Sequence, residues 1–207
     1  MSQRQSHRSG SQAAKSRTYS QLRIIGGQWR GRKLRFVPAS GLRPTTDRVR
    51  ETLFNWLAPR IHGARCLDLF CGSGALGLEA LSRGGAHCDF VDSHNANVQQ
   101  VQTHLNTLQA DAVGHCHTMT AGDFLASTRQ SWDIVFIDPP FGQALIEPAS
   151  TLLQIQRLRP DALIYIERGI HEPEPLLPAS WQLHRDKRAG EVSYRLYRYN
   201  QLLPVSP

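Results

Sequence analysis

The 207-residue sequence has no apolar run long enough to cross a bilayer, and its polar, basic N-terminus lacks the apolar core of a secretory signal. Its four cysteines have no CxxC spacing, and its nine histidines follow no metal-binding or catalytic-triad pattern. These absences argue against a membrane protein, a secreted disulfide scaffold and a metalloenzyme. We expect a soluble cytoplasmic monomer with reduced thiols and no bound metal, long enough to bury one sizeable core.

Acidic residues are absent from the first 46 residues, which contain ten Lys or Arg. The rest of the chain contains 14 basic and 17 acidic residues, so the net charge of +7 arises entirely at its front. Such an excess is typical of a protein that binds a polyanion, and a solubilising basic tail is the alternative. The sequence divides into a disordered basic arm at 1–20, an N-terminal hairpin and helix at 21–60, and a main domain at 61–207.

The segment LRIIGGQWRGRKLRF, residues 22–36, places two short apolar and basic runs around glycines, which predicts a β-hairpin. A helix is expected next, beginning near Thr46 or Asp47 and ending before Pro59. The basic residues of these two elements are the predicted RNA contacts: Arg23, Arg30, Arg32, Lys33, Arg35, Arg48 and Arg50. For the two helix arginines, an ordinary solvated role fits the sequence equally well.

The stretch LDLFCGSGALGLEALSRGG predicts a buried strand, a glycine turn and an amphipathic helix. Gly72, Gly74 and Gly77 match the G-x-G-x-x-G fingerprint, so a nicotinamide dehydrogenase is a candidate. Asp68, inside the strand, would repel a pyrophosphate but suits a cationic sulfonium methyl donor. Asp92, which ends the next apolar run, suits the ribose diol of either cofactor. Together the two acids favour S-adenosylmethionine.

Beyond residue 65 the sequence alternates between strand-like and helix-like runs. Strands are expected at 65–70, 87–92, 114–121, 132–138 and 162–168, with helices that include 94–109 and 144–157. The closing WQLHRDKRAGEVSYRLYRY alternates as a β-hairpin does. The predicted fold is α/β: a Rossmann-like, doubly wound, seven-stranded and mostly parallel sheet with an antiparallel C-terminal edge hairpin. A small N-terminal β-hairpin and helix extend it.

The fourth expected strand of this series ends in Asp138, Pro139, Pro140 and Phe141. Two prolines fix an extended backbone and remove two N–H donors, which leaves carbonyls facing outward. The Asp138 carboxylate and the Pro139 carbonyl can grip both hydrogens of an exocyclic amine, and Phe141 can stack on a flipped-out base. This predicts in-line methyl transfer governed by positioning and electrostatics. A plain strand terminator is the alternative.

Asp123 and Phe124 follow the third expected strand, where an acid can accept the adenine amino group and an aromatic can pack on the ring. A helix cap explains Asp123 equally well. The predicted cofactor-binding residues are Asp68, Phe70, Gly72, Ser73, Gly74, Gly77, Asp92, Asp123 and Phe124.

These stretches resemble the class I S-adenosylmethionine-dependent methyltransferases and, among them, the bacterial 16S rRNA guanine-N2 methyltransferases of the RsmD type. The resemblance spans about 23–199 and rests on RIIGGQWRGRKL, RPTTDRVRETLFNWL, LDLFCGSGALGLEALSRG, FIDPPF and AGEVSYRLYRY. It implies methyl transfer to the N2 amine of one guanine of 16S rRNA, in an assembled or assembling small subunit. By position it implies cofactor roles for Asp68, Gly72, Gly74, Asp92 and Asp123, and target-base roles for Asp138, Pro139, Pro140 and Phe141.

Other functions also fit the sequence. An adenine-N6 methyltransferase acting on DNA or RNA would share every catalytic residue. A non-catalytic RNA-binding assembly factor would use the basic front of the chain alone, and its function would survive loss of Asp138. The sequence leaves open which nucleotide is methylated and whether naked rRNA or an assembled subunit is the substrate.

Overall fold

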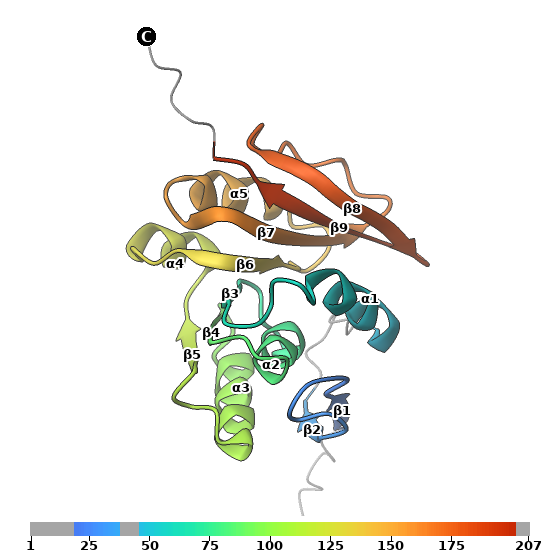
Figure 1. Ribbon diagram of the computed structural model, residues 1–207, viewed down its shortest axis with the longest axis vertical. Coiled ribbons are helices and arrows are strands. Elements are labelled where there is room, and N and C mark those ends of the chain that lie inside the picture. The colour runs from blue at the N-terminus through green and yellow to red at the C-terminus, as the bar shows by residue number, and fades with distance from the viewer. Residues whose placement is uncertain (1–18, 38–45, 202–207) are drawn as a thin grey trace, which may run out of the picture.

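The computed structural model describes residues 19–37 and 46–201 (Figure 1). Most of the predicted basic arm at 1–20 lies outside these residues. A seven-stranded sheet forms the body, in the spatial order β5 (Gly114–Thr118), β4 (His87–Asp92), β3 (Arg65–Asp68), β6 (Trp132–Ile137), β7 (Leu158–Gly169), β9 (Val192–Tyr199) and β8 (Trp181–Ala189). The first five strands are parallel, and β9 runs antiparallel to both of its neighbours. The predicted fold class is therefore confirmed, although β5 is shorter and β7 longer than expected.

Two hydrophobic layers cover the sheet, because alternate residues of each strand face opposite sides. One layer joins the sheet to α1 (Asp47–Leu57), α2 (Ala75–Ser82) and α3 (Asn95–Leu108). The other joins it to α4 (Ala121–Ser127) and α5 (Ile146–Gln154). Neighbouring residues of β6 illustrate the alternation, since Phe136 belongs to the first layer and Val135 to the second. The sheet therefore has a core on both faces, as doubly wound folds require.

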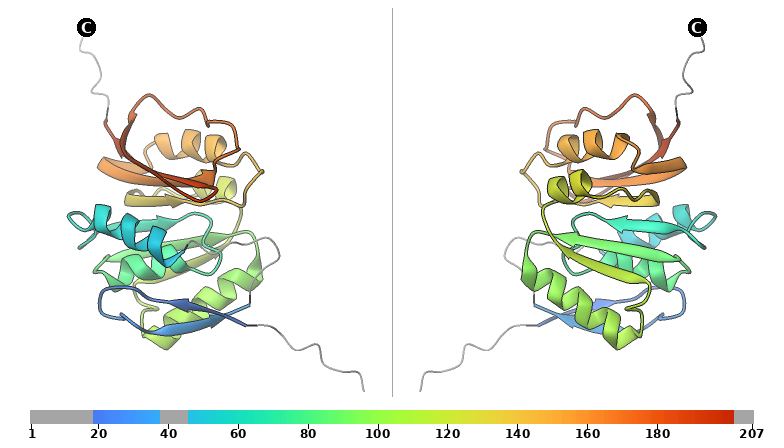
Figure 2. Two further views of the ribbon diagram at one scale, coloured as in Figure 1. Left: turned by 90° about the vertical axis from the view of Figure 1, so that its right-hand side faces the viewer. Right: turned by 90° about the vertical axis from the view of Figure 1, so that its left-hand side faces the viewer.

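The predicted N-terminal hairpin is present as β1 (Ser20–Arg23) and β2 (Lys33–Phe36), paired antiparallel. It packs on α2, because the backbone N–H groups of Ile25 and Gly26 donate to the carboxylate of Glu79, each at 2.8 Å. Gly27 has φ +75°, and a Cβ there would lie 1.8 Å from the backbone oxygen of Ser82. Figure 2 shows this hairpin at one end of the molecule and the β8–β9 hairpin at the other.

Helix α1 also forms as predicted. Thr46 is its N-cap, accepting a hydrogen bond of 3.4 Å from the Val49 N–H, and the helix ends at Leu57, before Pro59. Its apolar residues Val49, Leu53 and Leu57 are buried, and Trp56 is half-buried and stacks on Tyr194 of β9 at a centroid distance of 5.6 Å. This contact anchors α1 to the antiparallel edge of the sheet. Within the described residues, no helix is long and apolar enough to span a bilayer.

Candidate active site

A cavity of about 730 Å³ opens where β3, β4 and β6 end. Its lining comes from the turn after β3, the segment after β4, the start of α4, and the loop and helix that follow β6. Ligand sites in open α/β sheets lie at the carboxyl ends of the strands, and pockets for drug-sized ligands have volumes of about 300–1,000 Å³. The cavity therefore has the place and the size expected of a cofactor and substrate site.

Asp92 lines the cavity at the end of β4. One carboxylate oxygen accepts from the Gly72 N–H at 2.9 Å and from the Asn97 side-chain amide at 3.0 Å. The other accepts from the His94 N–H at 2.8 Å. The side chain is 11% exposed, so the carboxylate is fixed in orientation and still borders the cavity. An acid held in this way can accept hydrogen bonds from two adjacent hydroxyl groups.

Asp68 lies beneath the glycine turn and does not line the cavity. Its carboxylate accepts a hydrogen bond of 2.9 Å from the Gly77 N–H, which ties the end of β3 to the first turn of α2. Burial raises the pKa of Asp68 from 3.8 to about 7, with the Gly77 N–H opposing this shift and the charge of Asp92 adding to it. The structure thus places Asp68 under the turn, where its carboxylate fixes the backbone that leads from the cavity into α2.

The three glycines of the motif have different surroundings. Gly72, at φ +50°, lines the cavity with bare backbone. Gly74 is the N-cap of α2 in the left-handed region, at φ +78°. Gly77 lets α2 approach the sheet, because a Cβ there would lie 2.2 Å from the ring of Phe90. Neither Gly74, Gly77 nor the predicted Ser73 lines the cavity, whereas Phe70 does.

The DPPF segment forms the opposite wall. Asp138, Pro140 and Phe141 line the cavity, while Pro139 is buried beside them. Phe141 is 43% exposed, which is unusual for a phenylalanine and leaves its ring available at the mouth of the cavity. The loop is held from outside by Glu172, whose carboxylate accepts from the backbone N–H of Gly142.

The segment after β5 differs from the sequence expectation. Thr120 is the N-cap of α4: its hydroxyl accepts from the Asp123 N–H at 3.1 Å and donates to the Asp123 carboxylate at 2.7 Å. Phe124 is 4% exposed and packs on the rings of His117 and Trp132. The prediction that Phe124 packs on a cofactor ring is therefore wrong, because its side chain belongs to the core. Gly122 is among the residues that border the cavity instead.

Several of the residues that line the cavity were not predicted from the sequence. Asn97 lies in the first turn of the helix that follows Asp92, and Thr120 opens a T-x-x-D capping pattern, so both were within reach of sequence reasoning. The remaining unpredicted residues that line the cavity are Leu69, Ser93, His94, Ala121, Gly122, Gln143, Leu145, Pro148 and Ala149. They come from the segments after the strands and from the first turns of α4 and α5, so their place at the cavity depends on how these elements pack.

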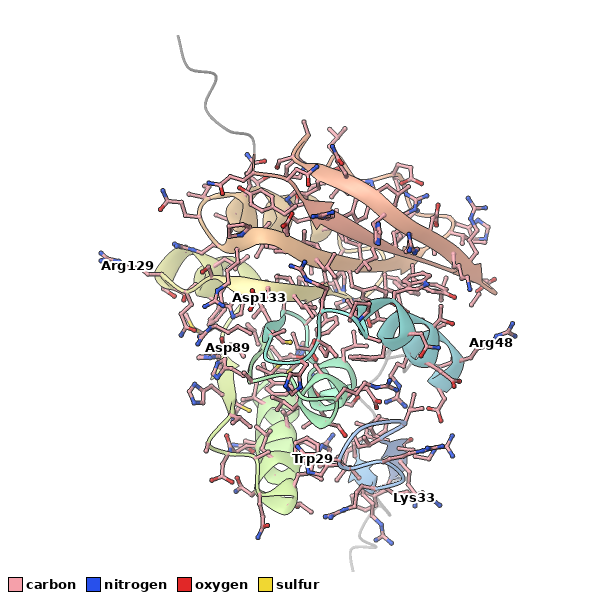
Figure 3. The ribbon with its side chains drawn as sticks, viewed as in Figure 1. Trp29, Lys33, Arg48, Asp89, Arg129 and Asp133 are labelled. Atoms are coloured by element: carbon pink, nitrogen blue, oxygen red, sulfur yellow. The ribbon has the colours of Figure 1, made fainter. Side chains whose placement is uncertain are left out.

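The predicted RNA-contacting residues are exposed except for one. Arg30, Arg32, Lys33, Arg35 and Arg48 are exposed on the hairpin and α1, and Figure 3 shows Lys33 and Arg48 pointing outward. Arg23 is also exposed and forms an ion pair of 2.9 Å with Asp47.

Arg50 is only 1% exposed and cannot reach an RNA phosphate. It lies 2.6 Å from the Asp47 carboxylate and 3.8 Å from that of Glu79, and it donates to the Arg23 carbonyl at 2.9 Å. The RNA-binding role predicted for Arg50 is therefore wrong. Its guanidinium binds α1 to α2 and to β1.

A separate polar cluster on β4 and β5 is built around the buried carboxylate of Asp89. It accepts from the His117 ring and from the Trp132 indole N–H, each at 2.9 Å. Burial alone would raise the pKa of Asp89, but hydrogen bonds from His117, His87 and Trp132 lower it overall. His87 and His117 thus help to hold this buried carboxylate in place.

The strand order, with β9 antiparallel between β7 and β8, and the cavity after β3, β4 and β6 define a methyltransferase of class I architecture. The family model described as conserved hypothetical protein 95 matches residues 22–198, and the chain belongs to this family.

Comparison with individual proteins supports the same assignment. The chain is 52% identical to ribosomal RNA small subunit methyltransferase D of Escherichia coli (strain K12), over 181 residues that cover 86% of this chain and 90% of that one. A solved structure of a putative methyltransferase, yhhF from Escherichia coli, superposes with a TM-score of 0.80 at 52% identity, covering 87% of this chain and 99% of that one.

A more distant solved structure shows the same fold. The 16S rRNA N2 G1207 methyltransferase (RsmC) of T. thermophilus, in complex with AdoMet and guanosine, has a TM-score of 0.60 at 21% identity. The superposition covers 89% of this chain and 50% of that one.

Proposed function

We propose that the chain transfers a methyl group from S-adenosylmethionine to the exocyclic N2 amine of a guanine in 16S rRNA, with the small ribosomal subunit or its precursor as substrate. The observation that carries the proposal is that one cavity brings together the glycine turn, the fixed Asp92 carboxylate and the DPPF segment. The name of the 52% identical Escherichia coli relative supports rRNA of the small subunit as the target.

The donor groups around the cavity fit S-adenosylmethionine. The Asp92 carboxylate is positioned to accept hydrogen bonds from the two ribose hydroxyls, and the bare Gly72 backbone leaves room beside it. Asp68 lies one layer below the turn, where a bound cation would stabilise its ionised form and a pyrophosphate would destabilise it. When bound, this cofactor supplies an electrophilic methyl group. The same features disfavour a nicotinamide dehydrogenase.

Asp138, Pro139 and Phe141 act on the target base. The Asp138 carboxylate and the Pro139 carbonyl hold the two N–H bonds of the amine, so that the nitrogen lone pair is no longer held in conjugation with the ring. Phe141, exposed at the mouth, stacks on the flipped-out base and fixes its plane. The nitrogen becomes acidic as it is alkylated, and its proton passes to Asp138 or to water. Catalysis therefore rests on orientation and electrostatics.

Labelled methyl transfer followed by nucleoside analysis tests this function. Naked 16S rRNA and small subunits that lack the modification are offered separately, and the RNA is digested to nucleosides. We expect label in N2-methylguanosine, and the better substrate shows whether the enzyme recognises RNA alone or an assembled surface. Label in N6-methyladenosine would replace guanine by adenine as the target. Absence of transfer to either RNA, with the cofactor bound, would overturn the proposal.

A further inference from the structure

The N-terminal hairpin presents part of its basic surface away from the cavity. The Arg32 guanidinium donates to the carbonyl of Thr107, at the C-terminal end of α3. Asn97, which lines the cavity, lies near the N-terminal end of the same helix. Thr107 is ten positions after Asn97, and at 1.5 Å per position the two are separated by about 15 Å along the helix. Arg32 can therefore hold RNA on the α3 side of the cavity, and RNA on the other sides of the cavity requires other contacts.

The β8–β9 hairpin carries an excess of positive charge that the sequence as a whole conceals. Residues 181–199 contain five Lys or Arg and two Asp or Glu, whereas residues 47–180 contain nine Lys or Arg and fifteen Asp or Glu. The only strongly basic segment of the main domain is thus its antiparallel edge. A polyanionic ligand of this otherwise acidic domain would be attracted to that edge.

Strand register places this edge level with the DPPF segment. Ile137 of β6 pairs with Ile166 of β7, so Asp138 is level with the next residue, Glu167. Glu167 pairs with Tyr194 of β9, and Tyr194 pairs with Lys187 of β8. Neighbouring strands lie about 4.8 Å apart, which puts the Lys187 backbone about 14 Å from that of Asp138. A long basic side chain there lies within reach of phosphates a few nucleotides from the target.

The basic side chains at this end of β8 face solvent. Arg185, Lys187 and Arg188 are all exposed. The Lys187 ammonium lies 6.0 Å from the ring of Trp56, beside α1, whose Arg48 points outward (Figure 3). Burial lowers the pKa of His184, and the charges of Arg185 and Arg198 lower it further. The local field is therefore positive.

We propose that Lys187 and Arg188, assisted by Arg185, bind RNA backbone phosphates next to the flipped target nucleotide. This inference rests on the proposed function and adds a second RNA contact, at the antiparallel edge of the sheet, to the contact expected from the N-terminal hairpin. Arg195 and Arg198 contribute less, because ion pairs to Glu174 and Asp161 already hold them. Phosphate contacts of this kind position the RNA without reading its sequence.

The test uses the full chain with the double variant Lys187→Gln/Arg188→Gln. We expect the KM for RNA to rise about tenfold, kcat to stay within about twofold, and the slope of log affinity against log salt to fall by about 1 to 2. The charge-preserving variant Lys187→Arg/Arg188→Lys should behave as the wild type. A matched control removes two exposed arginines close to the strands' N-terminal ends, Arg60→Gln/Arg129→Gln, and should leave all three quantities unchanged.

The outcomes separate this inference from the proposed function. Wild-type KM and salt slope in the Lys187→Gln/Arg188→Gln variant, with a normal melting temperature, would overturn the phosphate contact while leaving methyl transfer intact. An equal loss in the Arg60→Gln/Arg129→Gln control would also overturn it, because the effect would then come from net charge alone. If the wild type transfers no methyl group, the proposed function fails, and filter binding of 16S rRNA to the same variants decides the contact by itself.

Discussion

The Asp68 carboxylate accepts a hydrogen bond of 2.9 Å from the backbone N–H of Gly77, across the turn that joins β3 to α2. This single contact fixes the start of α2 relative to the strand and so sets the path of the glycine turn. The acid is 2% exposed, and burial raises its pKa to about 7. The turn is therefore built over a group that is costly to ionise.

The cost of ionising the buried Asp68 carboxyl group should be visible in the pH dependence of the protein's stability. The pKa of Asp68 is 3.8 as a free side chain and about 7 in the fold. Between these values the unfolded chain releases a proton that the folded chain keeps, so the free energy of unfolding falls as pH rises from about 4 to 7. Asp68→Asn removes this loss. Above pH 7 we expect the free energy of unfolding of the variant to be a few kcal/mol larger than that of the wild type, since one pKa unit corresponds to about 1.4 kcal/mol.

Urea unfolding of both proteins at pH 5 and pH 8 measures this difference. The advantage of Asp68→Asn should be larger at pH 8 than at pH 5. An advantage that stays constant between the two pH values would contradict the raised pKa.

Gly77→Ala should destabilise the protein. The new methyl group would lie 2.2 Å from the Phe90 ring and 2.8 Å from the Cys88 sulfur, so α2 must move away from β4. Overpacking of this kind costs about 1–3 kcal/mol, and the melting temperature should fall accordingly. In Gly122→Ala, the nearest atom to the new Cβ is the Thr120 hydroxyl oxygen at 4.0 Å, so this helical control should be neutral or slightly stabilising. Equal melting temperatures for the two variants would count against the packing role of Gly77.

Alanine substitutions of Arg48 and Arg50 should affect stability differently, although both residues lie on α1. Arg50→Ala leaves the buried Glu79 carboxylate without its arginine on α1 and should cost about 3 kcal/mol of stability. Arg48→Ala, at an exposed position, should change stability by less than about 0.5 kcal/mol. It should instead reduce the salt dependence of RNA binding. Chemical denaturation with a parallel binding assay measures both, and equal destabilisation would refute the distinction.

Asp92→Ala should weaken cofactor binding. It removes the acceptor for the Gly72 N–H and the Asn97 amide as well as for the ribose hydroxyls, so we expect the dissociation constant of S-adenosylmethionine to rise at least about tenfold. Isothermal titration calorimetry with S-adenosylmethionine and with its 2′-deoxy analogue measures the effect. The wild type should discriminate between the two ligands and Asp92→Ala should not. Discrimination retained by the variant would place the ribose elsewhere.

The sequence predicts the fold well because hydrophobic periodicity and glycine turns are local signals. The strand that ends at Asp68, the helix capped by Thr46 and the closing hairpin all depend on short patterns, and all are present. Asp92 and Asp138 were found because the first ends a buried strand of the parallel sheet and the second directly follows one. Parallel strands bring their carboxyl ends to one edge, so residues at those positions meet in the structure.

Other features depend on tertiary packing and were missed or misassigned. Phe124 comes soon after the end of β5, yet the short helix α4 turns its ring into the core. Arg50 has the sequence context of a surface arginine, and only the approach of Glu79 from α2 makes it a buried ion-pair partner. Lys187 and Asp138 lie at the same level of the sheet because of the register of three successive strand pairs. No local sequence pattern reveals this register.

The single-turnover rate of methyl transfer by Asp138→Ala tests the central claim most directly. The structure puts this acid on the wall of the cavity, facing the space that Asp92 and the glycine turn share. We predict that the rate falls by about 10²–10³, the usual effect of losing an electrostatic contact in the transition state, while affinity for 16S rRNA stays within about twofold. A wild-type rate in this variant would contradict the claim that the DPPF segment holds the reacting amine.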